Sequence, residues 1–391
     1  MRLPLDALRL AIRFLVPLTI WYGAGRIIRH LLLLAISHVG HGRFPAERRV
    51  LALLLLSLVV LVSLAVTIGM LLTLARGLRR APLEQPLREE SYRAAVFRSL
   101  LPFVIVYLAW NLFQADAHDA LRFDAQRLGD QGNALEAGSV FIGIPLTLAL
   151  AIMIVAWSLR MVCERWHWRS PGRVSASLVA FFEVNFTLYG VLSIGVVAAS
   201  IGSWIGDRNL WQDLAEVPGL AFAGSLVPPV KDALVLPIIW FAMTAVVYGV
   251  ELRGRDVVTG TRLEALHERF SGVGGADRPA DRAGREVGRG FRDKYVPLLH
   301  AGRLAFAAGG PAAALFCLCY VAIGIGMDAA QRTAAALIGP AHTVQFWNVA
   351  LVPLEFGHGL LAEVLRLALL AAMFDLVISA RTPASDPLPA G

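Results

Sequence analysis

The sequence is poor in charged residues, cysteine and lysine, and each shortage narrows the class of protein. Only 17% of its 391 residues are charged, whereas soluble domains contain about a quarter. With 57% hydrophobic residues and a mean hydropathy of +0.62, this composition predicts a membrane protein. Three cysteines, an odd number, exclude a framework in which every cysteine is paired. Only two of the 36 basic residues are lysine, a bias typical of GC-rich bacterial coding.

The sequence also lacks the short motifs of the common enzyme classes. It has no phosphate-binding loop of the form G-x-x-x-x-G-K, no G-x-S-x-G and no H-E-x-x-H. We therefore predict no cofactor and no metal, and the missing nucleotide site argues against a stand-alone ATP-driven pump. The net charge of +7 comes from basic residues at the ends of apolar runs, which favours contacts with anionic lipid over nucleic acid.

Eight apolar runs approach the length of about 20 residues that a membrane-spanning helix needs. The predicted fold class is all-α: a polytopic integral membrane bundle of about eight transmembrane helices, with residues 1–391 forming a single transmembrane domain. The N-terminal run is expected to be a retained anchor. The predicted spans are 13–39, 50–75, 96–114, 139–160, 174–202, 230–251, 300–327 and 347–380.

The distribution of Arg and Lys predicts the orientation. With the N-terminus inside, the inner segments hold 25 of these residues and the outer segments hold eight. Because cytoplasmic loops carry the excess of basic residues, we expect both termini in the cytoplasm of a cell with an inner membrane. Residues 41–49 are the exception, since they place three arginines outside.

The longest connection, residues 253–298, is rich in Gly and Arg and is expected to be cytoplasmic. Thr261 and Glu264 have the spacing of a capping box, and Leu263, Leu266 and Phe270 follow at helical spacing. This pattern predicts a short amphipathic helix that offers a surface to a protein partner.

The last span carries five ionisable residues, which is rare because each charge at bilayer depth costs about 2.5–3.5 kcal/mol. On a helix, Glu355, His358, Glu363 and Arg366 fit within an arc of about 140°, whereas Asp375 falls on the opposite side, near the cytoplasmic interface. We expect the first four to form an intramembrane polar site, with Glu363 nearest the middle. His358 is alternatively a solvated residue at the outer boundary.

Pro353, Gly357 and Gly359 surround the first of these charges. Proline removes a backbone donor and glycine weakens a helix, so the pattern predicts a bent or partly unwound segment. Broken helices with ionisable groups are typical of transporter sites. In the alternative interpretation, Glu363 and Arg366 only pair with each other.

Arg26 and Arg29 interrupt the first span, one turn apart. An arginine stays charged, so it needs a carboxylate partner if it is buried. Within the spans, the sequence offers Glu183, Glu355 and Glu363. The alternative is that both arginines reach the interface from a shorter, tilted helix.

Two further groups of polar residues have weaker patterns. Asn185 and Tyr189 are one turn apart in the fifth span and either line a path or hydrogen-bond neighbouring helices, which we favour. Asp116, His118 and Asp119 lie close together in a predicted outer connection. They have the atoms of a metal site, but without a second cluster we interpret them as an acidic loop.

The sequence therefore predicts a transporter or channel-like permease for an ion, a proton or a small polar solute. An accessory subunit or scaffold, in which the same charges only hold helices together, is the alternative. A membrane enzyme acting on lipids comes third, because only Asp116, His118 and Asp119 hint at a catalytic group.

Overall fold

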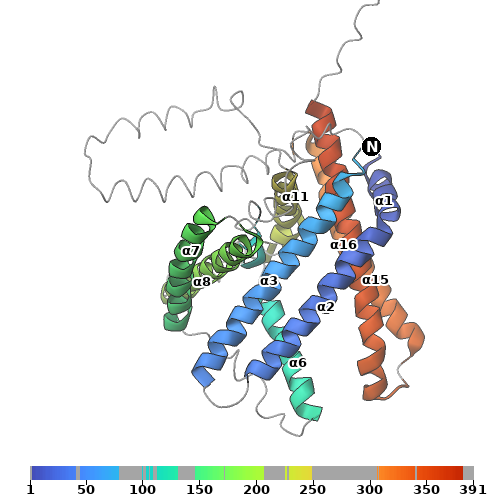
Figure 1. Ribbon diagram of the computed structural model, residues 1–391. Helices are drawn as coiled ribbons and strands as arrows, with labels where there is room; N and C mark the ends of the chain where they lie inside the picture. Colours follow the sequence, from blue (N-terminus) through green and yellow to red (C-terminus); the bar gives the residue numbers. More distant parts are fainter. Residues whose placement is uncertain are drawn as a thin grey trace, which may run out of the picture.

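The structure, a computed structural model, is a bundle of helices, and the residues that it describes contain no strand (Figure 1). The prediction of an all-helical chain is confirmed for these residues. The described residues are 2–40, 45–78, 99, 103–104, 106–108, 112–130, 146–170, 172–206, 225–226, 229–248, 306, 308–339 and 341–381. The 253–298 connection lies outside them.

The helices vary from one turn to more than ten. In chain order they are α1 (Leu3–Arg13), α2 (Leu15–Gly40), α3 (Pro45–Ala75), α6 (Leu112–Asp130), α7 (Leu146–Arg169), α8 (Arg173–Gly206), the π-helix η2 (Lys231–Val235), α11 (Leu236–Val247), α15 (Gly310–Ile338) and α16 (Val344–Arg381).

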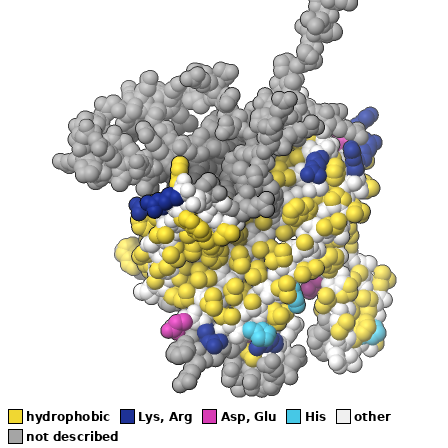
Figure 2. All heavy atoms as spheres, viewed as in Figure 1, with side chains coloured by type: hydrophobic (Ala, Val, Ile, Leu, Met, Phe, Trp, Pro, Cys, Tyr) yellow, Lys and Arg dark blue, Asp and Glu magenta, His cyan; other side chains and the backbone are white. Residues whose placement is uncertain are grey.

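Four of these helices are long and apolar enough to cross a membrane: 47–75 in α3, α7, 174–204 in α8, and α15. The total of eight spans stays a prediction. Many large apolar side chains point outward, among them Ile20, Ile154, Val162, Ile194 and Ile325, each more than half exposed. Figure 2 shows hydrophobic side chains over the middle of the molecule, with charged ones toward its upper and lower ends.

Helix α3 occupies the centre of the bundle. It contacts α2, α6, α8, α11 and α16, and the α7–α8 hairpin packs on it through α8 (Figure 1). One side of α3 is deeply buried, including Leu53, Val60, Ile68 and Leu71. A helix that is hydrophobic all round needs such neighbours to be stable.

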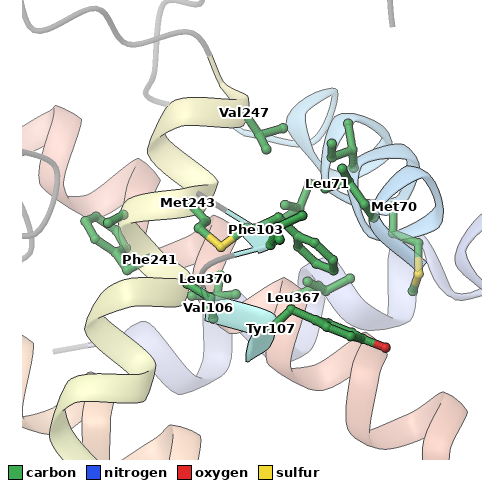
Figure 3. Packing of buried hydrophobic residues seen from close by; sticks show 14 of the residues in the cluster. Met70, Leu71, Phe103, Val106, Tyr107, Phe241, Met243, Val247, Leu367 and Leu370 are labelled. Carbon is green, nitrogen blue, oxygen red and sulfur yellow. The ribbon is translucent and has the colours of Figure 1, made fainter. Parts of the chain in front are cut away.

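The C-terminal half of α3 belongs to a core of four converging segments (Figure 3). The labelled residues come from four parts of the chain. They are Met70 and Leu71 of α3; Phe103, Val106 and Tyr107; Phe241, Met243 and Val247 of α11; and Leu367 and Leu370 of α16. This core fixes α16 against α3, which positions the charges of the last helix.

Close contact between α2 and α3 depends on glycine. A Cβ atom added at Gly69 would lie 2.9 Å from ring atoms of Trp21, and one at Gly25 would lie 2.7 Å from a methyl group of Val66. The two helices are antiparallel, so these contacts repeat along the pair. Small residues at such positions let helix backbones approach closely.

Several boundaries differ from the expected ones. Residues 112–130 form helix α6 instead of belonging to an outer loop, and α15 continues to Ile338, past the expected end at 327. Helix α7 likewise runs on to Arg169. In each case a hydropathy pattern marks where apolar residues end, whereas the helix continues as long as its backbone bonds are made.

The predicted unwinding around Pro353 is wrong, because α16 is one continuous α-helix with this proline inside it, whereas the bend stays a prediction. The proline removes one backbone hydrogen bond near the beginning of a long helix, which the remaining bonds and the packing tolerate. At Pro237 the outcome is different. There, the five residues of η2 precede the proline, and the wider turn makes room for its ring.

Two buried tyrosines link outer helices to the backbone of α3. The Tyr189 hydroxyl of α8 donates to the Leu53 carbonyl at 2.9 Å, and the Tyr248 hydroxyl donates to the Leu71 carbonyl at 3.0 Å. The ring of Tyr248 also meets Phe374 of α16 edge-on, with centroids 4.8 Å apart. These bonds fix the position along α3 at which each neighbouring segment packs.

We predict that Tyr189→Phe lowers the unfolding free energy by about 1 kcal/mol, the usual contribution of a buried hydrogen bond. The matched control is Tyr107→Phe, because Tyr107 is as deeply placed but its hydroxyl makes no hydrogen bond with a described residue. Thermal unfolding of both variants in detergent measures the difference. An equal fall in both would contradict the role of the Leu53 bond.

Candidate functional site

A cavity of about 190 Å³, lined by both apolar and ionisable side chains, lies between α2, α3 and α16. It brings together Arg26 and Arg29 of α2 and Glu363 of α16, three residues that the sequence singled out separately. Its walls are formed by Tyr22, Gly25, Arg26, Arg29, Val62, Ser63, Val66, Thr67, Met70 and Glu363. All three helices contribute from near their midpoints, and the cavity opens to the outside of the bundle at Arg26, whose side chain is exposed.

Arg29 is held by two carboxylates from α6. One guanidinium nitrogen binds Asp116, and the other is 2.6 Å from Asp119. The side chains of Arg29 and Asp116 are only 17% and 7% exposed, whereas Asp119 is 48% exposed. Glu183, Glu355 and Glu363 were the expected partners of Arg29, and that expectation was wrong.

The contact between α2 and α6 continues beyond this ion pair. Ser37 donates to Asp124 at 2.6 Å and accepts a hydrogen bond from Arg127 at 3.1 Å. Ser37 and Asp124 each follow the Arg29–Asp116 pair by the same number of residues, so the two helices run in the same direction. This polar contact holds α2 in place beside the cavity.

Burial raises the pKa of Asp116 above its ordinary value, and the Arg29 guanidinium opposes that shift. Desolvation disfavours the charged carboxylate, and one of its oxygens is buried without a hydrogen-bond partner among the described residues. Asp116 lies in α6, outside the four candidate spans. Its charge therefore depends on Arg29.

Arg26 lines the same cavity without a comparable partner. No described residue forms an ion pair with it, although Glu363 lines the opposite wall. Ser63 donates to a backbone carbonyl of its own helix, and Thr67 makes no hydrogen bond with a described residue. Besides Arg29, the cavity thus offers the Arg26 guanidinium, the Glu363 carboxyl group and the hydroxyl groups of Thr67 and Tyr22 to a small polar molecule.

Tyr22 connects the cavity to α16. Its ring meets Phe356 edge-on with centroids 5.4 Å apart. Its hydroxyl lies where a Cβ atom on Gly359 would be, so only glycine leaves room for it. Gly357, two residues earlier, has open space beside it. The glycine that seemed to weaken α16 instead lets α2 approach.

Arg366 lies one turn after Glu363 but does not pair with it. Its guanidinium carbon is 5.6 Å from the ring centroid of Tyr320 on α15, and its Nε is buried without a hydrogen-bond partner among the described residues. Gly324 leaves it space, since a Cβ there would be 3.2 Å from the guanidinium. A cation over an aromatic ring gains roughly 0.5–2 kcal/mol, so Tyr320 stabilises Arg366 beside the cavity.

His358 and Glu355 lie away from the cavity. His358 Nε2 is 3.1 Å from an Asp328 carboxylate oxygen on α15, and Glu355 is exposed. The sequence interpretation missed Asp328 because it ended the preceding span one residue earlier. Four charges on one face of α16 were expected to act together, but the helix is long enough to distribute them among different neighbours.

Glu183 and Asn185 are on the other side of α3. Glu183 lies 3.9 Å from Arg160 of α7, and the Asn185 amide donates to the Phe181 carbonyl of its own helix at 2.8 Å. Tyr189 thus makes the interhelical hydrogen bond that the sequence favoured, whereas Asn185 bonds only within its own helix among the described residues. Neither residue lines the cavity.

No metal site is apparent in the part of the chain that the structure describes. No group of three or more His, Cys, Asp or Glu side chains there is arranged to hold an ion. Asp116 and Asp119, which have the sequence spacing of metal ligands, are directed instead at Arg29.

We predict that Gly359→Ala destabilises the protein by about 1–3 kcal/mol, the usual cost of overpacking, because the methyl group would occupy the position of the Tyr22 hydroxyl. Gly357→Ala, its control on the same helix, is expected to be neutral or stabilising by up to about 1 kcal/mol. Thermal unfolding in detergent compares them. Similar results for the two variants would contradict the close approach of Tyr22.

We also predict that Arg29→Gln costs about 3 kcal/mol or more, since it leaves Asp116 buried without its cation. Asp116→Asn in the same chain should recover most of that loss. The defect should be largest at neutral pH and shrink on acidification toward about pH 4. A folded-state pKa above the unfolded value means that the folded state binds the proton more readily, so acid favours folding.

Unfolding curves of the single and double variants, measured between these pH values, provide the test. Asp119→Asn is the control, because that carboxylate is half exposed and remains solvated without Arg29. A defect that is independent of pH, or one that Asp116→Asn does not relieve, would show that Asp116 is not the group left uncompensated.

No protein-family model matches this chain, and comparisons with curated proteins and with solved structures give no match either.

Proposed function

We propose that this chain is a multi-pass membrane protein that moves an ion, a proton or a small polar solute through the cavity between α2, α3 and α16. The observation that carries this proposal is the cavity itself, in which Arg26 of α2 and Glu363 of α16 lie at mid-helix and form no ion pair with a described residue. Ionisable groups at that depth usually mark a solute or proton pathway.

The surroundings support a membrane setting. Four helices have the required length and hydropathy, and large apolar side chains cover the outside of the bundle. A soluble protein rarely exposes apolar patches of this extent. We propose eight spans, with both termini on the cytoplasmic side of a bacterial inner membrane.

Each group in the cavity has a role that its chemistry supports. Arg26 attracts an anion or a carboxylate, Glu363 binds a proton or a cationic group, and Thr67 offers a hydroxyl for hydrogen bonding. Arg29 also lines the cavity, but its charge is already balanced by α6. It therefore holds the wall in place and leaves binding to Arg26.

A specific observation favours the alternative of an accessory subunit. The ion pair between Arg29 and Asp116 uses buried charge only to hold α2 against α6, as expected of helix pairing. A partner would then bind elsewhere, for example at the 253–298 connection. A lipid-active enzyme has no comparable support, since Asp116 and Asp119 are engaged with Arg29.

The test is flux in liposomes that contain the purified protein. We expect wild-type protein to pass at least one probe from a panel of protons, potassium, chloride and phosphate, and Glu363→Gln to slow that flux at least about tenfold, which corresponds to about 1.4 kcal/mol. Arg26→Gln should lower the flux of an anionic probe most.

Glu355→Gln is the matched control, because it removes the same charge from an exposed position of the same helix and should leave the flux unchanged. Equal effects at Glu355 and Glu363 would contradict the assignment of the cavity. Wild-type protein that passes no probe, yet copurifies with a fixed partner, would favour the accessory subunit. Full flux in the charge swap Glu363→Arg with Arg366→Glu would make these charges structural.

A further inference from the structure

A second and larger cavity lies at the end of the bundle where the chain begins and α16 ends (Figure 1). Its volume is about 410 Å³, and its walls come from α1, the end of α3, the beginning of α15 and the end of α16. Arg2, Arg9 and Arg13 line it together with Asp6 and Asp375. Figure 2 shows Lys and Arg side chains gathered at this end of α1.

Helix α1 gives this cavity its basic wall because its residues are sorted into three strips. Arg2, Asp6, Arg9 and Arg13 repeat every three or four positions and fall within about 60° of the helix circumference. They form one strip that faces the cavity. Sorting of this kind is typical of helices that lie at a membrane interface.

The other two strips of α1 are apolar. One is buried against α16, and the other is exposed, with exposed fractions of 55%, 47% and 67% for its three residues. The buried strip consists of Leu3, Ala7 and Ala11, and the exposed strip of Leu5, Leu8 and Ile12. An exposed apolar strip beside a basic cavity places the cavity next to the hydrocarbon of a bilayer.

The charges of the cavity do not cancel. Arg9 lies 3.5 Å from Asp6 in an exposed pair, which contributes little. Arg2 and Arg13 form no ion pair with a described residue, and the Arg13 guanidinium carbon is 5.4 Å from the ring centroid of Phe14. Among the described residues that line the cavity, three arginines against two aspartates leave one positive charge, which a phosphodiester with its single negative charge balances.

We propose that this cavity binds one anionic phospholipid. The three arginines contact its phosphate, and Leu10, Leu315 and Leu376, which also line the cavity, cover the adjoining glycerol and upper acyl chain. A soluble phosphate compound shares the phosphate chemistry but gains nothing from these leucines or from the exposed strip of α1. The site requires the proposed membrane setting and is independent of transport.

The test compares lipids bound to the purified full chain in detergent by native mass spectrometry. We expect dioleoyl phosphatidylglycerol to bind at least about tenfold more tightly than dioleoyl phosphatidylcholine, since each arginine near a lipid surface contributes roughly 1 kcal/mol. Arg9→Gln with Arg13→Gln should abolish that preference. Leu376→Trp, or Leu315→Trp if the first does not fold, fills the cavity without changing its charge and should abolish it too.

Arg165→Gln with Arg169→Gln is the matched control, because it removes two exposed arginines from the end of α7. A preference for phosphatidylglycerol that survives in the control variant and in none of the others supports the site. An equal loss in both double variants, or full binding in the filled variants, means diffuse surface attraction and overturns it. Competition by glycerol 3-phosphate as strong as that of the lipid overturns the lipid assignment in favour of a soluble phosphate. The lipid-binding experiment tests only this site, and the flux experiment tests only the proposed transport, so either proposal can fail without the other.

Discussion

An arginine cannot release its proton inside a protein, and this constraint at Arg29 organises one half of the bundle. The charge has to be met by carboxylates, and α6 supplies two of them. Because α6 is held there, α2 is fixed in position and orientation against α3. The same arrangement leaves Arg26, one turn earlier, facing the cavity with its charge unbalanced by any described residue. One arginine is thus held by carboxylates, whereas the other lines the cavity without an ion pair to a described residue.

The central helix α3 holds its neighbours mainly by apolar contacts, because it has no strong charges along its buried length. Glycine at position 69 lets α2 approach, tyrosine hydroxyls from α8 and from the residue after α11 bond to its carbonyls, and α16 packs on its C-terminal half. The apolar contacts determine how near the helices come, and the few polar contacts determine their position along α3. A small cavity then remains where Ser63 and Thr67 of α3 line the same space as the charged residues of α2 and α16.

The sequence predicted helices throughout and indicated the ionisable residues at which to look, and Arg26, Arg29 and Glu363 indeed line one cavity. Hydropathy predicted the helices well because a long apolar run forms few structures other than a helix. It could not identify Asp116 as the partner of Arg29, since pairing across 87 residues depends on packing that no local pattern encodes. Nor did it predict continuity at Pro353, because a helix held by its neighbours tolerates one missing donor.

The equal spacing of the contacts between α2 and α6 has a consequence for synthesis. Helices α2 and α6 run in the same direction, and the counter-charge of Arg29 is made 87 residues later. At about 5–20 residues per second, the arginine waits roughly 4–17 s for it. During that interval the guanidinium has no carboxylate from α6 and has to be solvated in another way. The α2–α3 pair is therefore incomplete until α6 has been made.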